Sequence, residues 1–165
     1  MSELSELLER FRRGPELVAM SITGAAGAEL DFVPAPGKWS VRQILCHLAD
    51  GEIVAAARFR TVLAEDNPLI VAYDQDAWAA NLDYTHRKIA HALETFRHMR
   101  ATTYEVLHAA PEAAFERKAK HSERGTFTLI DLLRLMVRHA EKHCEQISGV
   151  RQEYKASTGK SESKA

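Results

Sequence analysis

The chain has 165 residues and a formal net charge of −1, from 22 basic and 23 acidic residues. That length suits one domain with a sizeable core, and the even charge balance argues against nucleic acid or an anionic membrane as a partner. The acidic start does not resemble a signal peptide, and no apolar stretch has the length of a membrane span. Two cysteines, Cys46 and Cys144, are too few for a disulfide scaffold, so we expect a reducing, cytoplasmic location.

Apolar residues at helical spacing predict a first helix over residues 4–22. Gly14-Pro15 interrupts the pattern, so we expect a kink there, and the glycines of residues 24–27 end the helix. Residues 31–39 contain two prolines and a glycine between apolar residues, which predicts an extended connection.

A second long helix is predicted over residues 41–65. Ser40 and Gln43 match a capping box that starts it, and Asn67-Pro68 stops it. The pattern then weakens, but Asp74 is a suitable cap for a short helix that runs to Leu82.

Two further long helices are predicted in the second half of the chain. The third covers residues 85–108, and residues 109–125 are irregular. Thr128 and Asp131 resemble a weaker capping box at the start of the fourth helix, which runs to about Tyr154.

The tail, residues 155–165, has no apolar residue beyond alanine and is expected to be disordered. We find no internal repeat and no strand with convincing alternation. The prediction is an all-α four-helix bundle with long irregular connections, formed by a single domain over residues 1–154.

His139 and His143 are the most informative pair in the sequence. Four residues apart in a helical pattern, they share one face, and that face lies near the apolar stripe that points into the bundle. Buried imidazoles need partners for their nitrogens, and a metal ion is one partner that contacts both rings. The alternative is a pair of core histidines that form hydrogen bonds to side chains or water.

A catalytic metal site typically has three protein ligands, so the pair requires a third donor from another helix. His47 is our candidate, since it lies at the flank of the apolar stripe of the second helix. Its competitors are the histidines of the third predicted helix, His86, His91, His98 and His108. A di-iron carboxylate site fits poorly, because only one Glu-x-x-His unit is present, at residues 105–108.

Several segments together make the chain resemble the DinB-like, YfiT-related helical bundles, a family that includes DfsB. The matching motifs are the Trp-Ser, His-Leu and Glu stretch of residues 39–52, the His-to-Gly-to-Thr-Leu turn of residues 121–129, and the His-x-x-x-His-x-x-Gln-Ile motif of residues 139–147. The turn lacks the proline that often follows its histidine. The resemblance implies a metal site formed by His47, His139 and His143.

Four residues are candidates to support that site: Glu52, Arg100, His121 and Gln146. Glu52 and Arg100 lie near the centres of their apolar stripes, where an unpaired charge is costly, so we expect them to pair. The pair could also be purely structural. Gln146 lies beside His143 and could orient it, act as a cap or face solvent. His121 precedes a glycine turn and could approach the mouth of the site.

The resemblance implies an enzyme whose divalent ion, zinc or nickel first and iron as a further option, activates a thiol or water. Similar proteins include transferases of low-molecular-weight thiols such as bacillithiol or mycothiol, and proposed metal-dependent hydrolases. We therefore expect a thiol S-transferase that acts on a small-molecule substrate, in a homodimer. The alternatives are a metal-dependent hydrolase, a bundle that binds metal or a small ligand without turnover, and a dimerising scaffold whose histidines are inert.

Overall fold

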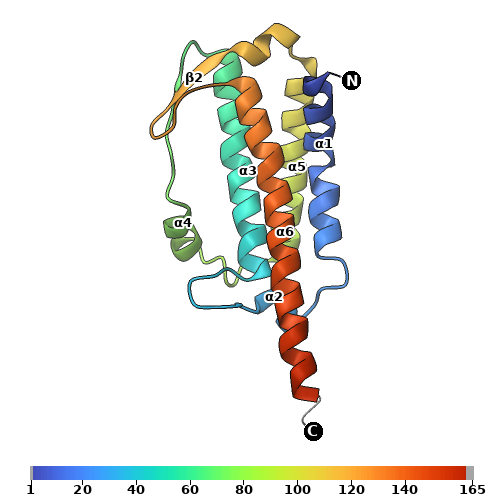
Figure 1. Ribbon diagram of the computed structural model, residues 1–165. Helices are drawn as coiled ribbons and strands as arrows, with labels where there is room; N and C mark the ends of the chain where they lie inside the picture. The colour runs from blue at the N-terminus through green and yellow to red at the C-terminus, as the bar shows by residue number, and fades with distance from the viewer. Residues whose placement is uncertain (1, 163–165) are drawn as a thin grey trace.

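The computed structural model describes residues 2–162, with side chains to residue 159. Four long helices form a bundle (Figure 1): α1 (Glu3–Ser21), α3 (Val41–Ala64), α5 (Ile89–Ala109) and α6 (Leu129–Glu162). α1 and α3 each pack against both α5 and α6, which confirms the predicted four-helix bundle. Within the described residues, no helix combines the length and the apolar character needed to cross a membrane.

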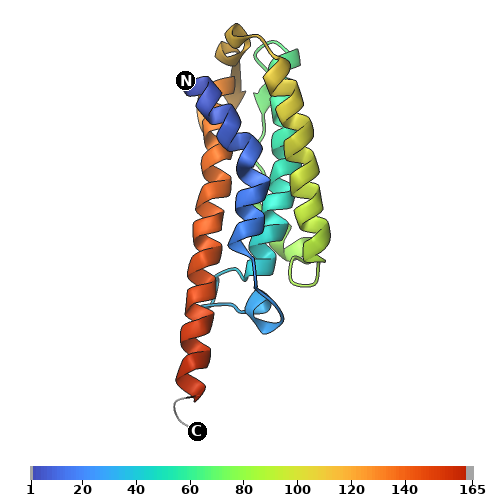
Figure 2. The same cartoon turned by 90° about the vertical axis from the view of Figure 1, so that its right-hand side faces the viewer.

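The direction of the helices explains the long connections. α3 and α5 run in one direction along the bundle, and α1 and α6 run in the other (Figures 1 and 2). Because α3 and α5 are parallel, the chain between them must return along the length of the bundle. It does so through β1 (Leu69–Ile70) and α4 (Gln75–Asn81), while α2 (Ala28–Asp31) lies in the connection from α1 to α3.

Three helix starts follow from the predicted caps. The Ser40 side chain accepts the backbone N–H of Gln43, and the Gln43 side chain accepts that of Ser40. Asp74 caps α4 with its carboxylate. Before α6, the Thr128 side chain accepts the backbone N–H of Asp131, and the Asp131 carboxylate accepts that of Thr128. These side chains satisfy N–H groups that have no partner within their helices.

Two predicted helix ends are wrong. The third long helix starts at Ile89 instead of Thr85, because a turn precedes it in which Asp83 has a φ of 50° and accepts a hydrogen bond from the Thr85 hydroxyl. The last helix continues past Tyr154 to Glu162, so residues 155–162 are not a disordered tail. In this extension the hydroxyls of Ser157 and Thr158 donate hydrogen bonds to the carbonyl of Tyr154. The last three residues of the predicted tail, 163–165, lie outside the described residues.

Among its described residues, the structure also contains three short strands that the sequence pattern did not reveal. Residues 109–125, expected to be irregular, contain the 3-10 helix η1 (Glu112–Glu116) and the strand β2 (Lys118–His121), which forms a hairpin with β3 (Gly125–Thr128). β1 adds to β2 in parallel, with Ile70 opposite His121. These strands are too short to show alternation, and β1 and β2 lie far apart in the sequence, so local patterns do not reveal them.

The Gly14-Pro15 dipeptide of α1 accommodates the side chain of Arg100. α1 is continuous through Pro15, which has no N–H to donate to the carbonyl of Phe11. Nη1 of Arg100 donates to that carbonyl instead, at 3.2 Å. A Cβ atom at position 14 would lie 2.6 Å from the same Nη1, so only glycine leaves room for the guanidinium. The two residues that predicted a kink therefore accommodate a buried arginine.

Arg100 also forms the predicted ion pair with Glu52. Its Nε and Nη2 donate to the two carboxylate oxygens of Glu52 at 2.9 and 2.7 Å, and both side chains are at most 1% exposed. The pair lies between two apolar clusters, one built around Phe59 and Leu133 and the other around Leu45 and Ile147. Burial raises the pKa of Glu52, and the Arg100 guanidinium opposes this by favouring the carboxylate.

Candidate metal centre

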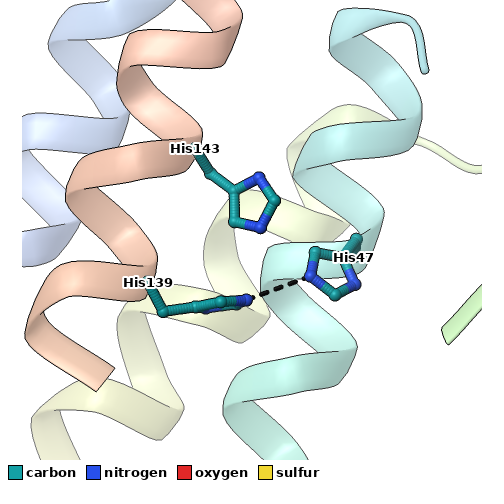
Figure 3. Close-up of side chains that lie close together, drawn as sticks. All are labelled: His47, His139 and His143. Carbon is teal, nitrogen blue, oxygen red and sulfur yellow. Dashed lines mark hydrogen bonds between the residues drawn. The ribbon is translucent and has the colours of Figure 1, made fainter. Parts of the chain in front are cut away.

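Three histidines converge in the groove between α3 and α6. His47 comes from α3, and His139 and His143 come from adjacent turns of α6 (Figure 3). One ring nitrogen from each lies within 4.8 Å of the other two, and the Nε2 atoms of His47 and His139 are 3.0 Å apart. The helical spacing of four thus places both α6 rings opposite His47, and the three could hold one metal ion.

Burial keeps these imidazoles in the neutral form that binds metal. Desolvation, aided by the charge of His143, lowers the pKa of His47 to about 4. Desolvation and the two neighbouring histidines lower the pKa of His139 to about 3. Desolvation also lowers the pKa of His143, against an opposing effect of its hydrogen bond to Gln146. All three rings are therefore ready to act as ligands at neutral pH.

Without a cation, neither tautomer suits the contact between His47 and His139. Their Nδ1 atoms are buried and have no partner within the described residues. If both rings carry their proton on Nδ1, two lone pairs face each other across 3.0 Å at Nε2. If one proton moves to Nε2, the Nδ1 of that ring becomes a buried acceptor without a donor. A cation held by these nitrogens would remove the lone-pair conflict, so the donor set fits a divalent metal.

Gln146 orients the third ring. Its Oε1 lies 2.8 Å from Nδ1 of His143, one helical turn away. An amide oxygen only accepts, so this contact places the proton of His143 on Nδ1 and leaves the Nε2 lone pair free for a ligand bond. Of the roles weighed for Gln146, the structure shows the contact with His143, although the side chain is exposed.

We expect Gln146→Leu to weaken metal binding about tenfold. Loss of a group that orients a metal ligand usually lowers metal affinity by about 10- to 100-fold, and we expect the lower value because Gln146 is exposed. Gln152→Leu is the matched control, since Gln152 is an exposed glutamine on the same helix. Competition with a chromophoric chelator measures both affinities. Equal affinities for the two variants would show that Gln146 does not position His143.

A pocket of about 410 Å³ adjoins the histidine cluster at His139, which forms part of its wall. Gly51 of α3 lies where the pocket meets His139: a Cβ there would be 3.4 Å from Cε1 of His139 and 3.5 Å from the hydroxyl of Tyr73. A side chain longer than alanine would fill the space between these two groups. Glycine at this position therefore keeps His139 accessible from the pocket.

The other predicted site residues occupy separate places. His121 lies on β2 and lines the same pocket, but it is not part of the histidine cluster. Glu52 and Arg100 lie in the core, and Arg100 influences the site through its charge, which contributes to the low pKa of His139. The cluster includes neither a cysteine nor any of the competing histidines His86, His91, His98 and His108. Cys46 and Cys144 are buried and unpaired, as expected.

Sequence reasoning missed several residues of the pocket, among them Gly51, Arg58, Tyr73 and Arg124. Gly51 and Arg58 lie four and eleven residues after His47, a spacing that keeps them on its face of α3, so helical periodicity could have found them. Tyr73 lies in the connection between α3 and α5, where no periodicity predicts its position. Its ring packs on Trp78 with 4.5 Å between the ring centroids.

Comparison with known proteins agrees with this architecture. The family model of the DinB superfamily matches residues 10–147, which is most of the chain. The chain belongs to the DinB superfamily. The DinB-like resemblance of its histidine and tryptophan motifs is therefore confirmed.

Relatives of this DinB-superfamily protein include one from Oceanobacillus iheyensis, 26% identical over 89% of this chain and 85% of its own length, and YfiT of Bacillus subtilis, 27% identical over 81% and 76%. Both have names that assign them provisionally as metal-dependent hydrolases.

The solved structure of YfiT superposes with a TM-score of 0.86 at 24% identity, covering 93% of this chain and 90% of YfiT. A mycothiol-dependent maleylpyruvate isomerase has a TM-score of 0.71 at 15% identity, over 88% of this chain and 61% of its own. The two structures support the fold.

Proposed function

We propose that this protein is a metal-dependent enzyme that transfers a low-molecular-weight thiol to a small electrophilic substrate. The observation that carries the proposal is the convergence of three neutral histidines, of which His139 lines a pocket, with two Nε2 atoms 3.0 Å apart. His47, His139 and His143 would hold the ion, and zinc, nickel and iron all suit imidazole ligands. When bound, the ion supplies Lewis-acid activation, which lowers the pKa of a thiol or a water molecule.

The side chains around the histidines limit the access of water to the site. His47 is 1% exposed, and the Trp39 ring packs against it with 5.0 Å between the centroids. His139 and His143 are half-buried, and His139 faces the pocket. A substrate can therefore approach the site from the pocket, and the low polarity around the rings strengthens electrostatic interactions there.

The carboxylates near the site favour a thiol over water as the nucleophile. Among the described residues, Asp50 already binds Tyr84 and Arg87, and Glu52 binds Arg100. Asp131 of the pocket wall pairs with Arg134. Glu123 also lines the pocket and forms no ion pair, but among the described residues no carboxylate belongs to the histidine cluster. The cluster therefore holds no carboxylate of its own to act as a general base. A free thiol has a pKa of about 8.5 and ionises far more readily than water, so it needs such a base least.

A metal-dependent hydrolase is the second candidate. The names of the curated relatives favour it, because several of them assign that activity provisionally. The same three histidines would serve, with water as the nucleophile. The two candidates differ in the co-substrate that the reaction consumes, which makes them separable by experiment.

Conjugation of thiols to a chlorinated nitroaromatic tests the proposal. The protein is purified without a histidine tag, stripped with a chelator, and assayed with zinc, nickel or iron and a panel containing bacillithiol, mycothiol, glutathione and coenzyme A. We expect at least one thiol to react faster with metal-loaded protein than with the same metal and thiol alone, and chelation to abolish the gain. If no thiol does so while ester or amide hydrolysis depends on metal, the hydrolase is the correct assignment. If neither reaction responds to metal, both assignments are wrong.

A further inference from the structure

The pocket beside His139 contains an arginine without a carboxylate partner. Arg58 is half-buried, and one of its N–H groups donates to the carbonyl of Val71 at 2.7 Å. None of the ion pairs found among the described residues involves Arg58. Every other buried or half-buried arginine in the described part of the chain has a carboxylate partner. Those arginines are Arg42, Arg87, Arg100, Arg117, Arg134 and Arg151.

A second arginine lines the same pocket. Arg124 lies in the turn of the β2–β3 hairpin and also forms no ion pair within the described residues. Desolvation lowers the pKa of Arg58, and the charge of Arg124 lowers it further. Desolvation also lowers the pKa of His121, which lies on the same wall, and the charges of both arginines add to this effect. Burial without a counter-ion is unfavourable for a cation, so this part of the pocket is complementary to an anion.

The carboxylates of the pocket do not neutralise these arginines. Asp131 accepts hydrogen bonds from Thr128 and pairs with Arg134. Glu123 is exposed and forms no ion pair within the described residues. The remaining wall is largely apolar and includes Phe127 and Leu132.

The cationic groups and the histidines lie at different levels of the same groove. Gly51, which borders His139, and Arg58 are seven residues apart on α3, or about 10 Å along the helix axis at 1.5 Å per residue. A small molecule could therefore place an anionic group at Arg58 and an uncharged reactive atom at His139. The apolar wall between the two levels suits an aromatic or aliphatic body.

We propose that the pocket selects substrates that carry a carboxylate, which binds Arg58 and Arg124 while the reactive end points toward His139. This inference rests on the proposed function for the identity of the reactive end, and it adds the substrate class. Guanidinium groups bind carboxylates through paired, charge-assisted hydrogen bonds, so the contact gives orientation as well as affinity. A neutral compound of the same shape lacks this contact.

Binding of 4-nitrobenzoate and of its neutral counterpart 4-nitrobenzamide to the metal-free protein tests the inference. We expect 4-nitrobenzoate to bind with a Kd of about 1 mM or lower, and the amide to bind roughly ten- to a hundred-fold more weakly. Arg58→Gln should raise the Kd of the carboxylate by at least about tenfold and leave that of the amide unchanged. Arg97→Gln removes the same charge from an exposed site on α5 and should change neither.

Arg124→Gln provides a second variant that does not depend on the bond to Val71, because Arg124 is exposed in a turn. It should weaken carboxylate binding even if Arg58→Gln lowers the melting temperature. Equal affinity for the two probes, no detectable binding of either, or unchanged affinity in Arg124→Gln would overturn the inference. If the carboxylate binds as expected but no thiol reacts, the anion site stands and the proposed function fails.

Discussion

Arg100→Met is expected to lower the free energy of unfolding by about 3–5 kcal/mol, the usual cost of removing one partner of a buried ion pair. The substitution leaves the Glu52 carboxylate in the core without a donor, and it removes the hydrogen bond to the carbonyl of Phe11 that Pro15 cannot replace. Denaturant unfolding followed by circular dichroism measures the change.

Two further variants separate loss of the ion pair from general damage. Arg97→Met alters an exposed arginine three residues earlier on α5 and should change stability by less than about 0.5 kcal/mol. The double variant Glu52→Gln/Arg100→Met removes both charges and should recover part of the loss. A single Arg100→Met variant as stable as the wild type would show that the ion pair does not hold the two apolar clusters together.

His47→Ala is expected to reduce metal-dependent turnover by about 1,000-fold or more, because it removes one of three ligands and with it several kcal/mol of Lewis-acid stabilisation. The metal-free variant should remain folded, since the structure shows no hydrogen-bond partner for Nδ1 of His47 that would be lost. Thiol conjugation with added metal measures the rate, and the melting temperature without metal measures folding.

His91→Ala is the matched control for this substitution. His91 is an exposed histidine of α5 outside the cluster, so its loss should leave the rate within about twofold of the wild type. Retention of more than about a tenth of the rate in His47→Ala would contradict the assignment of His47 as a ligand.

Much of the site could be predicted because its parts obey local rules. The spacing of His139 and His143 fixes their common face, and the stripes of α3 and α5 predicted that Glu52 and Arg100 would meet. Placing His47 with the α6 pair also needed the family resemblance. Helix periodicity alone gives the direction of a side chain and not its partner on another helix.

The rest depends on contacts between distant segments. Gly14 and Pro15 indicate a break when read locally, but in the fold they accommodate the guanidinium of Arg100. The three-stranded sheet joins residues about 50 positions apart, and its strands are too short to carry a pattern. Tyr73 reaches the site from a connection whose course is set by the parallel arrangement of α3 and α5 (Figure 1). These features required the tertiary structure.

Calorimetric titration of metal-free, untagged protein with zinc or nickel tests the central claim most directly. The account predicts one ion per chain in the wild type and in His91→Ala, and loss of this binding in His47→Ala, His139→Ala and His143→Ala. A wild-type protein that binds no ion, or one whose binding survives removal of each of the three histidines, would contradict it.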